Sequence, residues 1–479
     1  MLIRALVVWC LFAWVLLVVA LYAQDLPFEG PALGWAFVFA FPAALAVAQG
    51  ALGRKGVFEY PSAIFVVLTV WIGTMAPSFV VDSPEAHFVF GYSDAAVTLG
   101  RWLFFLWCTI VAVVCGRASD ESIRLEPRVF DVVAVVTPVA ASLGYLMVSG
   151  QFSNYQRADF AQLRPQGGAL AVATAIGTNV VLAIPGFLLL VFARARSTRL
   201  KVLARACFVL TWVILFLLGG RSPMAFAACV CFFVARRVGF KFRSGIAVSV
   251  AVALPVLFFL IFTYRNVLQS SNTRTTSIFD FMSVAADATG TIVTQEDARD
   301  AAVTQFSDNA KARLWYGPQF FVTADLWMDN GPALRGTFLA GVIQALPSWL
   351  SSTKNRLAES YSLEPILVQS GRFPDMDLSA TPWLQWLYEF GLLGIVVGAV
   401  LYGLLVRWID LRVARTKSVY EALFWLGMLT LIIGPESTTD AIVPIARNIG
   451  AMIGSAYLIV GILNRLFPTR TELRAARQS

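Results

Sequence analysis

About twelve long apolar stretches divide this chain, and most of them are long enough to cross a bilayer as a helix. A segment inside a bilayer must satisfy its own backbone N–H and C=O groups, so such stretches fold as α-helices. Hydrophobic residues make up 58% of the chain and charged residues only 14%, whereas charged residues are about a quarter of a soluble domain. The sequence therefore predicts an all-α, polytopic membrane protein.

The chain separates into expected spans and connections by its apolar periodicity and its turn residues. The twelve expected spans are Leu2–Tyr22, Leu33–Leu52, Ala63–Val81, Val97–Cys115, Phe130–Val148, Ala169–Phe192, Val202–Leu218, Pro223–Val234, Ile246–Tyr264, Trp383–Val406, Val419–Ile433 and Ile449–Phe467. The first begins near Arg4, as a signal peptide would, but its apolar run is too long for a signal core. We therefore expect it to be an uncleaved helix.

Basic residues gather at alternate connections between these spans, which predicts the orientation of the chain. They are Arg54 and Lys55; Arg117, Arg124 and Arg128; Arg194, Arg196, Arg199 and Lys201; Arg236, Arg237, Lys241 and Arg243; Arg407, Arg412, Arg415 and Lys417; and Arg470, Arg474 and Arg477. The positive-inside rule assigns these connections, and with them both termini, to the cytoplasmic side.

The seventh and eighth expected spans could also be drawn as one helix from Val202 to Val234. One helix would be long for a bilayer and would move later basic clusters to the outer side. Two helices that meet at Gly219-Gly220-Arg221-Ser222-Pro223 keep every basic cluster inside, and the glycines and proline suit a break. The sequence therefore favours two helices.

The longest connection follows the ninth span and comprises roughly 120 residues. It divides the chain into helices one to nine (1–264), an outer loop (265–382), helices ten to twelve (383–467) and a basic cytoplasmic tail (468–479). The loop mixes charges with apolar runs, and we expect Leu334–Leu350 to lie on the outer membrane surface. Enzymes that act on lipid-carried substrates need such a cap, whereas transporters keep their working residues near the bilayer midplane.

Composition also excludes several classes of site. All six cysteines fall within apolar spans, so no disulfide framework or metal site is expected, and no cofactor either. The single histidine, His87, lies in a predicted outer connection and is interpreted as a solvated loop residue. The net charge of +8 comes from short connections beside apolar spans, which favours membrane topology over nucleic-acid binding.

Arginine is scarce in outer connections, yet this chain has several arginines at or just beneath the predicted outer face. They are Arg101, Arg157, Arg164, Arg221, Arg265 and Arg447. A guanidinium offers a planar fork of donors that matches phosphate oxygens in pairs, so an anionic ligand such as a pyrophosphate is indicated. Arg221 at the Gly-Gly break and Arg265 at the root of the long loop are the leading candidates. The alternative is that these side chains snorkel to lipid phosphates.

The far end of the long loop carries a second polar group, where the chain re-enters the membrane. Arg372, Asp375 and Asp377 precede the tenth span, and Glu389 lies about two turns into it. A carboxylate here could take a proton from an attacking sugar hydroxyl. The two aspartates could instead form a solvated acidic turn, and Glu389 needs either a partner or a substrate because an isolated charge there is unfavourable.

With these residues the sequence resembles the Wzy-type O-antigen polymerases, within a group of membrane glycosyltransferases that includes the O-antigen ligases. The resemblance lies in Gly219-Gly220-Arg221-Ser222-Pro223, in Tyr264-Arg265-Asn266 before a large periplasmic loop, and in Glu389-Phe390-Gly391-Leu392-Leu393-Gly394 at re-entry. It covers Val202 to Val406 most clearly. The ligases carry a histidine late in the loop, where this chain has Asp375, Met376 and Asp377, and this difference favours a polymerase.

The resemblance implies a metal-independent enzyme of the bacterial inner membrane that joins oligosaccharide units carried on undecaprenyl pyrophosphate. Arg221 and Arg265 would hold the pyrophosphate as it leaves, with Asp375 and Asp377 as further catalytic candidates. Arg101, Arg157, Arg164, Arg372, Glu389 and Arg447 would contact pyrophosphate or sugar. Membrane lipid, a chain-length regulator and a flippase are the implied partners. The alternatives are an O-antigen ligase-type transferase and a transporter or flippase for lipid-linked saccharides.

Overall fold

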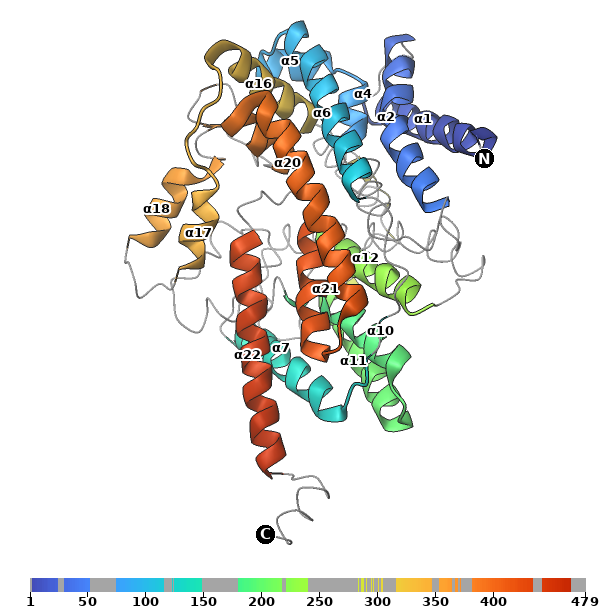
Figure 1. Ribbon diagram of the computed structural model, residues 1–479, viewed down its shortest axis with the longest axis vertical. Coiled ribbons are helices and arrows are strands. Elements are labelled where there is room, and N and C mark those ends of the chain that lie inside the picture. Colours follow the sequence, from blue (N-terminus) through green and yellow to red (C-terminus); the bar gives the residue numbers. More distant parts are fainter. Residues whose placement is uncertain are drawn as a thin grey trace. The chain divides into compact units, whose positions relative to one another are not determined.

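The structure is a computed structural model. It describes residues 2–24, 30–51, 75–115, 123, 125–148, 180–217, 221–239, 316–346, 353–363, 367–368, 371, 381–433 and 442–466, with scattered positions between 283 and 304. All regular secondary structure in these ranges is helical (Figure 1). The expected all-α class is therefore confirmed for the described part of the chain.

The chain forms two compact units, each built from segments that are distant in sequence. Unit 1 comprises Met1–Glu121, Val303–Ala414 and Leu431–Pro444, and unit 2 comprises Ser122–Ala302, Arg415–Thr430 and Ile445–Ser479. The helices of unit 1 are α1 (Leu2–Gln24), α2 (Gly30–Ala51), α4 (Ala76–Val80), α5 (Pro84–Phe90), α6 (Asp94–Cys115), α16 (Tyr316–Asn330), α17 (Leu339–Ala345), α18 (Lys354–Tyr361) and α20 (Pro382–Arg415, of which Arg415 belongs to unit 2). Those of unit 2 are α7 (Val129–Val148), α10 (Ile184–Arg194), α11 (Thr198–Leu217), α12 (Arg221–Arg237), α21 (Val419–Ile433, whose last turn belongs to unit 1) and α22 (Ile442–Leu466, whose first residues to Pro444 belong to unit 1).

Within the described residues, four helices are long and apolar enough to cross a membrane: α6, α7, α20 and α22. Shorter apolar helices occur in α1, α2, α10, α12 and α21. Many of their large apolar side chains are exposed, as is usual where a helix faces lipid; Leu393 is 69% exposed and Leu458 is 71% exposed. These features are consistent with a multi-pass membrane protein.

Some helix bounds coincide with the expected spans and others differ. The eleventh span has the bounds of α21, whereas α20 begins at Pro382, one residue before the tenth span, and continues to Arg415, beyond the predicted end at Val406. On either side of Gly219 and Gly220, which lie outside the described residues, the structure has two helices, α11 (Thr198–Leu217) and α12 (Arg221–Arg237). The last helix begins at Ile442, earlier than the predicted Ile449. The ninth span lies outside the described residues.

Contacts within unit 2 join helix ends that the predicted topology places on the same side. Arg196, which precedes α11, forms an ion pair with Glu126, which precedes α7. The Tyr420 hydroxyl, near the start of α21, donates a hydrogen bond of 3.0 Å to Asp131, near the start of α7. Both contacts connect segments predicted to face the cytoplasm, so they agree with the expected alternation of the spans.

The same agreement holds in unit 1 for α6 and α20, which the predicted topology orients in the same direction. Near the start of α20, Trp383 packs on Phe104 of α6, with 5.3 Å between ring centroids. Farther along, the Cys115 thiol at the end of α6 lies 3.7 Å from the Gly403 carbonyl oxygen of α20. The two helices therefore run parallel, as their predicted orientation requires.

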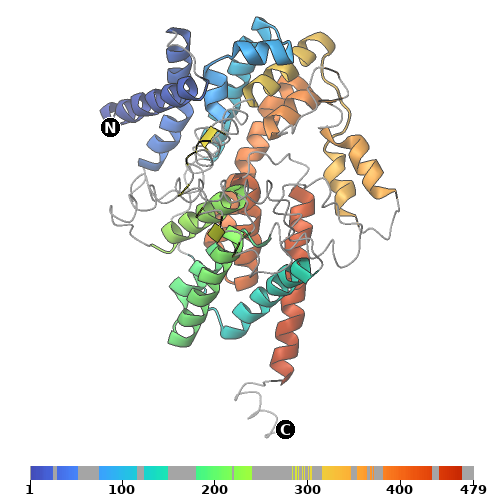
Figure 2. The ribbon, with the colours of Figure 1, turned by 180° about the vertical axis from the view of Figure 1, so that it is seen from behind.

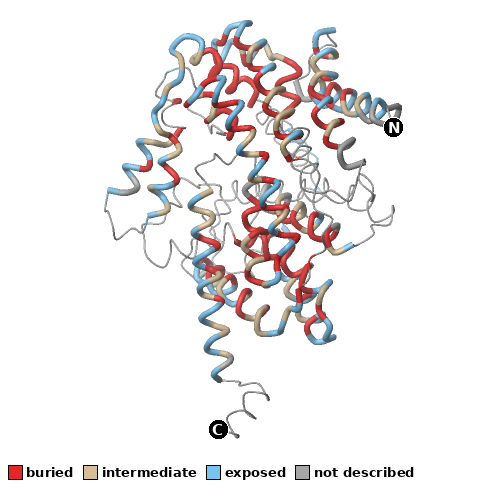
Figure 3. Tube along the Cα trace, viewed as in Figure 1, coloured by how far each residue is buried: buried red, intermediate tan, exposed pale blue. Residues whose placement is uncertain are grey.

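The predicted outer loop contributes directly to the core of unit 1 through α16. Phe320 and Phe321 lie 5.7 Å and 5.5 Å from Phe79 of α4, measured between ring centroids, and Phe79 stacks on Phe104 of α6 at 3.9 Å. Gly100 of α6 allows this approach, because a Cβ there would lie 2.6 Å from the Phe321 ring. Figure 3 shows the buried positions along α6 and the first half of α16. Part of the loop is thus packed between helices rather than only lying over them.

The remaining described helices of the loop, α17 and α18, pack against each other (Figure 2). On α17, Leu339 and Val342 are about half exposed, while Ala340 and Gly341 are buried. The described part of the expected apolar stretch, 334–346, therefore contains one short helix, with an exposed apolar side and a buried side of small residues.

Candidate functional site

A bend in α20 lies at the point where the chain re-enters the apolar core. The helix is interrupted at Gly391, whose φ of 63° and ψ of −142° are not helical. This conformation is open almost only to glycine, because a side chain would collide with the backbone. A Cβ on Gly391 would also meet the indole of Trp327 at the end of α16. The sequence therefore places glycine where both the backbone angle and the close packing require it.

Glu389 lies just before this bend and is buried, with 1% of its surface exposed. Its carboxylate accepts hydrogen bonds from the backbone N–H of Gly336 at 3.0 Å and of Thr337 at 2.7 Å. A buried carboxylate is stable only when its oxygens are bonded in this way. The Glu389 side chain therefore fastens the segment before α17 to α20.

Further contacts hold the loop segment 331–338 along the bend. The backbone N–H of Ala333 donates to the carbonyl of Tyr388 at 3.0 Å, and that of Leu334 donates to the carbonyl of Glu389 at 3.3 Å. Leu334 has a φ of 48°, the one positive value among the described non-glycine residues. Strained backbone of this kind persists only where surrounding contacts fix it, and it is frequent at functional sites.

Replacing Glu389 by alanine is expected to leave two backbone donors without a partner at a mostly buried position. Unsatisfied buried donors cost about 1–3 kcal/mol each, so we expect a loss of about 2–6 kcal/mol in the stability of this region. Limited proteolysis and thermal unfolding of the purified protein would measure it. Glu85→Ala, at an exposed position of α5, is the matched control. Equal protease resistance in the two variants would contradict the anchoring role of Glu389.

A second polar cluster, which we call the α5 corner, comprises Asp82, His87, Tyr92, Ser93 and Asp325. The His87 Nε2 is hydrogen-bonded to Asp82 Oδ2, and the Tyr92 hydroxyl donates to Asp82 Oδ1 at 2.7 Å. His87 is therefore not the freely solvated loop residue that the sequence indicated. Burial, followed by the charge of Asp82, raises the pKa of Tyr92, so its hydroxyl remains a hydrogen-bond donor.

The α5 corner also contacts the outer loop. The Ser93 hydroxyl donates to Asp325 of α16 at 2.6 Å, and α16 packs against α5. Asp325 precedes Trp327, which contacts Gly391, so the end of α16 lies between the α5 corner and the bend of α20. Both clusters thus occupy the part of unit 1 where predicted outer connections meet.

The α5 corner has a clear chemical capacity. A carboxylate that is hydrogen-bonded to one imidazole nitrogen orients the ring, as in the pairs that serve as general bases. The sequence contained a usable signal for it. Ser83 and Pro84 form a helix start, with the Ser83 hydroxyl accepting from the N–H of Ala86 at 3.4 Å. This start places His87 about one turn after Asp82.

Arg101, one of the predicted phosphate-binding residues, is largely engaged by the protein itself. Its Nε donates to the Phe79 carbonyl at 2.8 Å and its Nη2 to the Val80 carbonyl at 3.4 Å. The guanidinium also lies 5.2 Å from the centroid of the Trp35 ring. These contacts cap the end of α4, so Arg101 has fewer donors to offer a ligand.

The other described candidates belong to unit 2. Arg447 lies in α22, and its Nε and Nη2 donate to Oδ1 of Asn448 at 3.0 Å and 2.8 Å. Arg221 is the first residue of α12. The remaining predicted site residues lie outside the described residues: Arg157, Arg164, Arg265, Arg372, Asp375 and Asp377. Among the candidates, Arg101 and Glu389 thus share unit 1, while Arg221 and Arg447 share unit 2.

The described residues contain no group of three histidine, cysteine, aspartate or glutamate side chains placed to hold a metal ion. Comparison of the chain with protein-family models, with curated proteins and with solved structures finds no match.

Proposed function

We propose that this protein joins oligosaccharide repeat units, carried on undecaprenyl pyrophosphate, into O-antigen or a related surface polysaccharide at the periplasmic face of the inner membrane. It would be a twelve-span glycosyltransferase with both termini in the cytoplasm, and it would need neither metal nor cofactor. A hydroxyl of one lipid-linked unit attacks the anomeric carbon of the sugar on another, the bond from that carbon to the pyrophosphate breaks, and undecaprenyl pyrophosphate leaves.

One observation supports the proposal: α16, in the predicted outer loop, is packed against helices of unit 1, and the segment before α17 is bonded to α20. The first ten residues of α16 are buried, and the segment before α17 is bonded to Glu389 at the bend of α20. An enzyme with a lipid-carried substrate requires such a cap over the end of its helices, because the reacting sugar lies at the membrane surface. A transporter does not require one, since its site lies near the bilayer midplane.

The arginines supply the electrostatic part of the proposed reaction. Arg221 begins α12 directly after Gly219 and Gly220, and the free N–H groups of a helix start favour an anion. Arg221 and Arg265 would hold the pyrophosphate and stabilise the charge that grows on it as the glycosidic bond breaks. Asp375 or Asp377 would take the proton of the attacking hydroxyl.

The proposal is tested by the sizes of surface and lipid-linked glycans in cells that lack the gene, with and without its restoration. We expect long chains to disappear, while single repeat units are still attached to their final acceptor, and long chains to return with the intact gene. Because polymerisation, ligation and translocation act at different steps, the glycan that accumulates identifies the missing step.

Each other outcome contradicts the proposal in a distinct way. Undiminished long chains in the deletion strain would exclude a polymerase. Full-length polymer that remains on its lipid carrier would indicate the ligase-type transferase. Repeat units that accumulate on the cytoplasmic side would indicate a flippase. A strain that lacks a known surface-polymer ligase provides the matched reference for the second outcome.

A further inference from the structure

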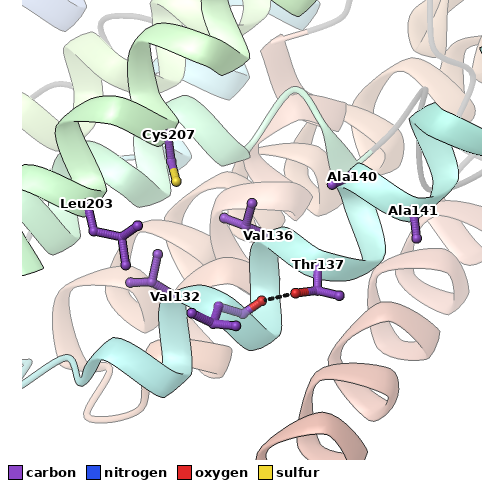
Figure 4. Close-up of a pocket in the computed structure, with 8 residues that line it drawn as sticks. Val132, Val136, Thr137, Ala140, Ala141, Leu203 and Cys207 are labelled. Carbon is purple, nitrogen blue, oxygen red and sulfur yellow. Dashed lines mark hydrogen bonds between the residues drawn. The ribbon is translucent and has the colours of Figure 1, made fainter.

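An apolar groove of about 340 Å³ runs between α7 and α11 in unit 2. Leu203 and Cys207 of α11 face Val132 and Val136 of α7 across it (Figure 4). The polar side chain in the wall, Thr137, donates its hydroxyl to the Val133 carbonyl of its own helix at 2.7 Å. The groove therefore offers hydrocarbon contacts and no free polar partner, which suits an alkyl chain.

Two arginines lie in line with the groove at its end. Arg128, directly before α7, precedes Val132 by four residues, and Arg199 precedes Leu203 by four residues on α11. The ion pair between Arg196 and Glu126 brings the starts of the two helices together, so Arg128 and Arg199 lie at the same end of the groove.

Both arginine side chains are available to an outside ligand. Arg128 and Arg199 are exposed, and within the described part of the chain neither guanidinium forms an ion pair. Arg196, close to Arg199, is instead paired with Glu126. Both connections are predicted to face the cytoplasm, where anionic lipid head groups attract arginine side chains.

We propose that this groove binds one anionic phospholipid of the inner leaflet, with an acyl chain along α7 and α11 and its phosphate between Arg128 and Arg199. The apolar wall selects a hydrocarbon chain and the two cations select a negative head group. A lipid-linked saccharide waiting at the outer face would not present its pyrophosphate at this end. The inference is independent of the glycosyltransferase reaction, because it concerns the opposite side of the membrane.

The probe is phosphatidylglycerol with a photoreactive group in its acyl chain, added to the purified full-length protein in neutral detergent. Mass spectrometry of the digested protein then locates the cross-links. We expect them on the α7 and α11 peptides that contain Val136 and Cys207, at lower lipid concentrations than with the phosphatidylcholine counterpart. Each arginine near the surface contributes about fivefold in affinity, so Arg128→Gln with Arg199→Gln should weaken binding roughly 30-fold.

Two further variants separate the groove from the general surface of the helices. Ala140→Trp, at an exposed position of the groove wall, should remove the cross-links. Arg205→Gln and Val209→Trp, exposed on other faces of α11, should leave them unchanged. All variants are exposed-surface changes, and a size-exclusion profile confirms that each still folds.

Three results would overturn the inference. Cross-links absent from both peptides would show that another part of the chain fills the groove. Equal labelling by phosphatidylglycerol and phosphatidylcholine would show that the arginines do not select an anionic head group. Unchanged labelling in Ala140→Trp would show that the lipid does not bind in the groove.

Discussion

Replacing Arg221 by alanine is expected to abolish chain extension while leaving membrane insertion and folding intact. Arg221 begins α12, where the helix start and the guanidinium would act on the same leaving pyrophosphate. Removing a preorganised donor from developing negative charge lowers a reaction rate by about 100- to 1,000-fold. The size ladder of surface glycans, at matched protein levels, measures this effect. Arg265→Ala should behave in the same way.

Two further variants test whether the effect is specific to the guanidinium group of Arg221. Arg221→Lys keeps a positive charge but not the planar fork, so it should restore chain extension poorly. Arg205→Ala, at an exposed position of α11, removes an arginine from the same unit but leaves the proposed pyrophosphate-binding arginines, Arg221 and Arg265, in place. It should give chains of normal length. Normal polymer from both Arg221→Ala and Arg265→Ala would show that these two arginines do not hold the leaving pyrophosphate.

Much of the helix layout could be predicted because membrane spans are a local property of the sequence. The bounds of α21 coincide with an apolar run. The basic residues predict on which side of the membrane each connection lies, and this stays a prediction.

The contacts that form the candidate site could not be predicted in the same way, because they join distant parts of the chain. Glu389 is bonded to Gly336 and Thr337, and the sequence indicates only that a buried carboxylate needs some partner. The loop was expected to lie over the membrane face, yet Phe320 and Phe321 of α16 pack against α4. A long loop with apolar runs has no local signal that distinguishes these positions.

Replacing Gly391 by alanine is expected to destabilise unit 1 strongly. Two independent effects combine there. The backbone conformation, with φ 63° and ψ −142°, costs a non-glycine residue about 1–3 kcal/mol. The new Cβ would also meet the Trp327 indole, and overpacking of this kind costs about 1–3 kcal/mol more. The expected loss is thus about 2–6 kcal/mol.

The consequence of Gly391→Ala should reach the anchored loop, because Glu389 lies two residues before the bend. A straightened α20 would withdraw its carboxylate from the N–H groups of Gly336 and Thr337. Thermal unfolding in detergent and protease cleavage within 331–338 measure the two effects. Gly34→Ala in α2 is the control, because the added Cβ would lie in open space there. This variant should be neutral or slightly stabilising.

A double variant separates the two causes. Adding Trp327→Ala to Gly391→Ala removes the collision but leaves the strained backbone, so the two changes should be less destabilising together than the sum of their separate effects. Additive effects would assign the loss to backbone strain alone. If Gly391→Ala were as stable as Gly34→Ala, the bend would not have this conformation, and the loop would have to be anchored to α20 in another way.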